Sequence, residues 1–153
     1  STAAATPNRQ PMPPGERELA RILLECSSGW RSKILEIVHL DYIQDPRVRR
    51  LLEDTASLGV EDGSASEFVN QLLQHGTDSD ANALVAELCT SPMPEITDES
   101  IRIQLKTLLQ RQAREGSRRL EPLIEAAEKR GDQAEVERLL AEKTRLRLES
   151  AEI

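Results

Sequence analysis

Aromatic residues are nearly absent from this chain of 153 residues, in which Trp, Tyr and Phe occur once each. Aromatic and β-branched residues favour strands, whereas Leu and Ala suit helices that pack on one another. Long apolar runs are absent too. None approaches the roughly 18 residues that mark a membrane span, and the N-terminus has no apolar stretch of the signal-peptide kind. The sequence therefore predicts an all-α protein with no membrane partner.

Residues that often perform chemistry are also scarce. The chain has two cysteines, Cys26 and Cys89, and two histidines, His39 and His75. A zinc site built from all four is one alternative, but they include no close Cys-x-x-Cys or His-x-x-x-His pair. We favour buried thiols, since each cysteine ends an amphipathic helical pattern, and surface histidines. No glycine-rich phosphate loop is present either. The sequence thus predicts no metal site, no cofactor and no catalytic residue.

Charge, by contrast, is abundant and unevenly spread. The formal net charge is −7, from 20 basic and 27 acidic residues. Residues 1–110 contain ten of the basic and 17 of the acidic residues, so residues 111–153 contain ten of each. An acidic protein is poorly suited to a large DNA footprint, because phosphate binding depends mainly on Lys and Arg. Dense, balanced charge at the C-terminal end is typical of a solvent-exposed helical segment.

The first 15 residues, STAAATPNRQPMPPG, are small, polar and rich in proline. Such a composition cannot bury much apolar surface, so residues 1–15 are predicted to form a flexible linker. The chain also begins without Met. We expect it to be a fragment of a longer protein, cut just inside an interdomain linker.

Residues 16–112 are predicted to form a helical bundle subdomain of about five or six helices. Apolar residues recur at helical spacing through the whole segment, including Leu19, Ile22, Leu23 and Cys26 at its start. The punctuation is clearest in DPRVRRLLEDTASLG, where Asp45 is the expected N-cap and Pro46 the first helical residue. Thr97 is the expected cap of the last helix. No β-strand pattern competes with these helices.

Residues 113–153 are predicted to form a second subdomain, a C-terminal helical hairpin. The segment RQAREGSRRLEP has few apolar residues, and Pro122 is expected to bend any helix that continues through it. Two apolar stripes follow. The first consists of Leu120, Leu123, Ile124 and Ala127, and the second of Val136, Leu139, Leu140 and Leu146.

The tripeptide Arg130-Gly131-Asp132 between these stripes has two interpretations. It is a cell-adhesion ligand when exposed on an extracellular protein, but nothing in the sequence suggests export. As a helix–helix turn, Gly131 fits the left-handed position after a helix. Asp132 then caps the next helix, and Glu135 completes a capping-box-like pair. We favour the turn.

The hairpin has more leucines than its two helices need for each other. Leu146, Leu148 and Ile153 are expected to be surplus, and an uncovered apolar stripe usually binds a further surface. A closed antiparallel pair folded back on the bundle is the alternative. The predicted partner-binding residues all lie on the second hairpin helix: Val136, Leu139, Leu140, Lys143, Leu146 and Leu148.

Several segments occur in an order that points to a known family. They are ERELARILLEC, DPRVRRLLEDTASL, ALVAELCTSP, ITDESIRIQLKTLLQRQ and RRLEPLIEAAEKRGDQAEVERLLAEKTRLRLE. With the preceding Pro-rich linker, this order resembles the C-terminal, helicase-binding domain of bacterial DNA primase. The resemblance covers nearly all of residues 16–150. Each motif consists mainly of helix caps and leucines, so the order and spacing are what support it.

The resemblance implies an adaptor rather than an enzyme. The hairpin would dock on the N-terminal domains of the replicative DNA helicase hexamer and recruit primase, which makes RNA primers, to the replication fork in the bacterial cytoplasm. The zinc and the divalent metal of the parent primase would belong to domains on the N-terminal side of the linker. Single-stranded-DNA-binding protein is a further candidate partner. Two alternatives are a free-standing helical regulator that sequesters another factor and, disfavoured by charge, a helix-turn-helix DNA-binding protein.

Overall fold

The computed structural model describes residues 11–59, 63–91 and 94–153, and this part of the chain is all helical, as predicted. The elements occur in the order α1 (Glu16–Glu25), α2 (Ser28–Ile37), η2 (Leu40–Tyr42, a 3₁₀ turn), α3 (Pro46–Leu58), α4 (Ala65–His75), α5 (Ser79–Thr90), α6 (Asp98–Arg130) and α7 (Gln133–Ala151).

Side-chain caps fix where the helices begin. The Asp45 carboxylate accepts a hydrogen bond from the Arg47 amide at 2.8 Å, and Pro46 occupies the first position of α3, where no amide donor is needed. The Thr97 hydroxyl accepts from the Ser100 amide at 3.1 Å. The Ser100 hydroxyl donates to the Thr97 carbonyl and also accepts from the Thr97 amide. Two orphan amides are thus satisfied at the start of α6.

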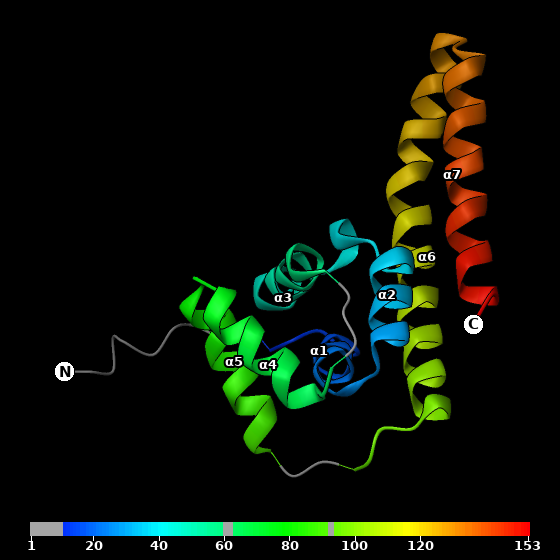
Figure 1. Cartoon of the computed structure of the whole chain (residues 1–153). Coiled ribbons are helices and arrows are strands. Elements are labelled where there is room, and N and C mark those ends of the chain that lie inside the picture. Colours follow the sequence, from blue (N-terminus) through cyan, green and yellow to red (C-terminus); the bar gives the residue numbers. More distant parts are fainter. Residues whose placement is uncertain (1–10, 60–62, 92–93) are drawn as a thin grey trace.

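The main core lies between α1, the neighbouring helices and the N-terminal half of α6 (Figure 1). Leu19, Leu23, Ile34, Val85 and Leu105 are each at most 1% exposed within it. Burying a side chain of this size stabilises the fold by about 1.5–3 kcal/mol. Phe68 is buried in this core, whereas Trp30 at its edge is only half-buried. The indole NH of Trp30 donates a hydrogen bond to the Asp98 carboxylate.

Helix α6 is continuous over 33 residues and passes through both Gly116 and Pro122. Its first half belongs to the bundle core, and its second half pairs with α7 (Figure 1). The predicted boundary between residues 112 and 113 therefore falls inside one helix. Pro122 lacks an amide donor and so removes one ladder bond, but α6 continues beyond it to Arg130.

A second, smaller core joins α6 to α7. It consists of Leu120, Ile124, Ala127, Val136, Leu139 and Leu146. The turn end of this hairpin stands away from α1–α5, while the C-terminus returns to the level of α2 (Figure 1). Ile153 packs against the main core.

Several expectations from the sequence need correction. Leu146 and Ile153 are not surplus, since Leu146 is only 2% exposed in the hairpin core and Ile153 contacts the bundle. Cys26 is buried as expected, but Cys89 is exposed. Of the predicted linker, residues 1–10 lie outside the described part. Met12, which follows them, packs partly against the main core, where its flexible thioether can fill an irregular gap.

Candidate partner-binding hairpin

The turn between α6 and α7 is built from the tripeptide Arg130-Gly131-Asp132. Gly131 has a left-handed backbone (φ 71°, ψ 20°), and its amide bonds the carbonyl of Glu128 at 3.0 Å. The Asp132 carboxylate accepts from the Glu135 amide at 3.2 Å. The Glu135 carboxylate does not complete a capping box and instead accepts two bonds from Arg138, which lower the pKa of Glu135.

The base of the hairpin is attached to the bundle through the segment 39–42. His39 Nε2 lies 2.6 Å from the Glu149 carboxylate of α7. Arg119 of α6 donates to the Asp41 carbonyl at 3.1 Å, and its guanidinium lies 4.7 Å from the centre of the Tyr42 ring. Burial raises the pKa of Tyr42, and the charge of Arg119 partly opposes this effect. These contacts hold the base of the hairpin against η2, and the turn end extends beyond them.

The six predicted partner-binding residues fall into two groups. Val136, Leu139 and Leu146 are 5%, 2% and 2% exposed, because they face α6. Leu140, Lys143 and Leu148 face outward, and the two leucines are 46% and 54% exposed. The Lys143 ammonium forms a loose ion pair with Glu121 at 3.8 Å. Only the outward group can contact a partner without opening the hairpin.

Leu123 was expected to face inward with Leu120 and Ile124, but it is 54% exposed. Position 123 lies to one side of the α6 face that meets α7, so Leu123 stays exposed although it is apolar. Leu123 adds a third exposed leucine to the hairpin. Distinguishing Leu123 from the buried Leu120 and Ile124 would have required knowing which α6 residues face α7.

A groove of about 500 Å³ lies along the seam between α6 and α7. Its apolar lining includes Ala113 and Leu140. Its basic lining consists of Arg114 and Arg118 from α6 and Lys143 and Arg147 from α7. Sequence reasoning missed this groove, although both basic pairs have the four-residue spacing that places side chains on one helix face. Only the antiparallel register of the hairpin brings the two pairs together.

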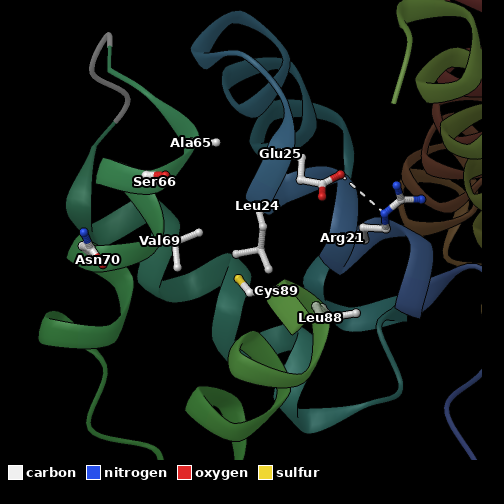
Figure 2. Close-up of a pocket in the computed structure, with 9 residues that line it drawn as sticks. All are labelled: Arg21, Leu24, Glu25, Ala65, Ser66, Val69, Asn70, Leu88 and Cys89. Atoms are coloured by element: carbon white, nitrogen blue, oxygen red, sulfur yellow. Dashed lines mark ion pairs between the residues drawn. The ribbon is translucent and has the colours of Figure 1, made fainter. Parts of the chain in front are cut away.

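A second hollow, of about 440 Å³, opens between α1, α4 and α5. Leu24 and Val69 lie close together in it with Cys89 beside Leu24, and Leu88 contributes to the lining (Figure 2). The Arg21–Glu25 ion pair, with a separation of 3.4 Å, stands at its rim (Figure 2).

Cys89 is a poor nucleophile in this hollow. Desolvation, together with the nearby charge of Glu25, raises the pKa of its thiol, so the reactive thiolate is scarce near neutral pH. Among the described residues that line the hollow, Cys89 is therefore not an activated nucleophile.

Neither a metal site nor a membrane span is found in the described part of the chain. Over residues 11–59, 63–91 and 94–153, no three His, Cys, Asp or Glu side chains are grouped so that they could hold a metal ion. Among the same residues, no helix combines the length and the apolar character needed to cross a bilayer.

Comparison with known proteins gives one structural similarity. No protein-family model matches the chain, and a search of curated proteins finds no match. Among solved structures, the helicase binding domain of primase from Mycobacterium tuberculosis is similar, with a TM-score of 0.47 and 14% sequence identity. The superposition covers 90% of this chain and 92% of that domain.

Proposed function

We propose that this chain is the non-catalytic C-terminal domain of a bacterial replicative DNA primase, and that it binds the replicative helicase hexamer. In this role it recruits RNA primer synthesis to the replication fork in the bacterial cytoplasm. Two things support the proposal: the order of sequence motifs that resembles this family, and a hairpin that projects from a well-packed bundle with leucines on its outer surface.

The exposed leucines are the observation on which the docking role depends most. Leu123, Leu140 and Leu148 are each 46–54% exposed on a hairpin whose own core is already complete. Leucines in such positions contribute little to hairpin packing, yet they can anchor a helix-in-groove contact. We propose that the N-terminal domains of the helicase cover the outer surface of α7, with Leu140, Lys143 and Leu148 in the contact.

The proposal divides chemistry and recruitment between parts of one primase. This chain would use no cofactor, and the zinc and divalent metal of the parent enzyme would be held by its other domains. A flexible tether between such domains would keep the polymerase close to the helicase, because linking raises effective concentration. Single-stranded-DNA-binding protein would be a second partner, while the net charge of −7 disfavours direct DNA binding.

The test is co-elution of the chain with the replicative helicase of the same bacterium in size-exclusion chromatography. At about 20–50 μM of each protein, a contact of micromolar affinity should move the chain into the helicase peak. Leu140→Asp should weaken co-elution, whereas Glu25→Gln, an exposed change on α1, should leave it intact. Absence of co-elution by the unmodified chain would reject the proposal and favour a free-standing regulator that sequesters a different factor.

A further inference from the structure

The groove between α6 and α7 is strongly basic on a protein that is acidic as a whole. Four of its lining residues are cationic, Arg114, Arg118, Lys143 and Arg147, and Glu121 is the one carboxylate among them. The chain as a whole has a formal net charge of −7. The groove is therefore a region of positive electrostatic potential on an acidic protein, and such a region attracts anionic groups.

The cationic side chains of the groove are incompletely paired. Arg118 contacts Glu115 at 3.5 Å and Lys143 contacts Glu121 at 3.8 Å, both at exposed sites where such pairs are weak. Within the described part of the chain, neither Arg114 nor Arg147 forms an ion pair with a carboxylate. An incoming carboxylate would therefore displace little existing interaction.

The basic surface extends from the hairpin toward the bundle. Arg114 and Arg118 also border a neighbouring hollow of about 230 Å³, whose lining includes a third arginine, Arg111, and two carboxylates, Glu16 and Glu115. The cationic side chains thus follow α6 over about two turns, from position 111 to position 118. A surface of this length suits an extended or helical segment better than a single small anion.

We propose that this groove binds an acidic peptide segment that carries an aliphatic side chain. The carboxylates of the segment would pair with Arg114, Arg118 and Arg147, because charge-assisted bonds from guanidinium to carboxylate are stronger than neutral ones. Its aliphatic side chain would contact Leu140, which lines the groove and is 46% exposed. This inference concerns the chemistry of the ligand and holds whether or not the helicase is the protein that supplies the segment.

A peptide fits this groove better than a nucleic acid does. Single-stranded nucleic acid is usually held by aromatic side chains on which bases stack, and the described residues that line the groove include none. The groove also contains Leu140, an apolar side chain with which a continuous row of phosphates would make no favourable contact. An acidic peptide can place carboxylates near the arginines and an apolar side chain over the leucine.

The test uses the complete chain and a synthetic probe. The probe is a fluorescein-labelled peptide of 14 residues, in which Asp and Glu surround two leucines. The control probe is a charge-reversed peptide in which Lys replaces Asp and Glu. A labelled oligothymidylate tests whether the groove binds single-stranded nucleic acid. Binding is measured by fluorescence anisotropy at low and moderate salt. The groove variant is Arg114→Gln with Arg118→Gln, and the protein control is Arg102→Gln with Arg130→Gln, which changes the net charge equally outside the groove.

The expected result is saturable binding of the acidic probe that weakens as salt rises. The groove variant should bind about tenfold more weakly, while the control variant stays within about twofold of the unmodified chain. Leu140→Ser should weaken the same probe without altering the far-ultraviolet circular dichroism spectrum. Equal binding by the groove and control variants would overturn the proposal, as would no binding up to about 1 mM probe. Tighter binding of the oligothymidylate, lost in the groove variant, would assign the groove to nucleic acid instead.

Discussion

Leu146 of α7 packs directly on the backbone of Gly116 in α6, at the point where the hairpin leaves the bundle. A Cβ atom added at position 116 would overlap Leu146 Cδ1 and would lie 2.9 Å from the Tyr42 hydroxyl oxygen. Glycine is therefore required at position 116 because α7 and Tyr42 approach its backbone closely, and not because of an unusual backbone conformation. The contact joins α6, α7 and η2 at one place.

Replacing Gly116 with Ala should destabilise the protein in spite of alanine's better helix propensity. The propensity gain is about 1 kcal/mol, whereas overpacking a closed contact costs about 1–3 kcal/mol. We expect a net loss of about 1 kcal/mol in the free energy of unfolding, measured by urea denaturation. Gly29→Ala is the matched control, because the nearest side-chain atom to a Cβ there is 3.8 Å away. A more stable Gly116→Ala variant would contradict the proposed packing.

The two leucines of α7 that sequence reasoning grouped together should behave differently. Leu146→Ala should cost about 2–5 kcal/mol, because it leaves a cavity in the hairpin core, while Leu140→Ala should cost less than about 1 kcal/mol. Thermal melts followed by circular dichroism measure both. In helicase co-elution, Leu140→Ala should impair docking although the fold stays intact. Equal destabilisation by the two variants would show that Leu140 is also a core residue.

The fold was largely accessible from the sequence because helix signals are local. Caps such as Asp45 and Thr97, the Pro46 start and the Gly131 stop act within one turn of chain, and apolar spacing identifies the helices between them. The structure places the helix ends at these residues.

The candidate site was less accessible because it depends on contacts between distant residues. Apolar spacing marks both Leu139 and Leu140, yet only the rotation of α7 against α6 decides that the first is buried and the second exposed. The basic groove needs residues 114 and 118 to meet residues 143 and 147 across the hairpin. A single sequence contains neither the rotation nor the register.

Thiol chemistry should distinguish the two cysteines. Burial raises the pKa of Cys26 to about 11, and the charge of Arg31 offsets this only in part. Cys89 is exposed, although desolvation and Glu25 raise its pKa as well. An aromatic disulfide reagent at pH 8 should therefore modify one thiol in the folded chain, more slowly than it modifies free cysteine, and the second only in denaturant. Cys89→Ser should abolish the first signal. Rapid modification of both thiols in the folded chain would show that Cys26 is accessible.

The turn of the hairpin should depend on glycine for its backbone alone. Gly131 has φ +71°, and a Cβ there would meet nothing within 4 Å. Gly131→Ala should thus cost about 1 kcal/mol from left-handed strain, whereas Gly131→Asn should cost less because asparagine tolerates this conformation. Urea denaturation of both variants provides the comparison. An alanine variant as stable as the original would mean that the turn can adopt another geometry.

Asp45 should give the protein part of its resistance to acid. The hydrogen bonds from the Arg47 side chain and amide, despite burial, hold the pKa of Asp45 below its ordinary value. A depressed carboxyl pKa stabilises the folded state above the pKa of an unfolded aspartate, about 3.9, and this contribution is lost as pH falls through the folded value. Asp45→Asn keeps an N-cap but loses the ion pair with Arg47, in which Asp45 Oδ2 lies 2.8 Å from Arg47 Nη2.

The expected cost of Asp45→Asn is about 1–2 kcal/mol at pH 7. Because the variant has no carboxyl at position 45 to protonate, the difference from the unmodified chain should shrink as pH falls below about 4. Urea denaturation at pH 7, 5, 4 and 3 measures this convergence. Glu137→Gln, which removes an exposed carboxylate of α7, should show a much smaller effect at every pH. A difference between Asp45→Asn and the unmodified chain that stays constant down to pH 3 would show that the Arg47 contact does not act through the charge of Asp45.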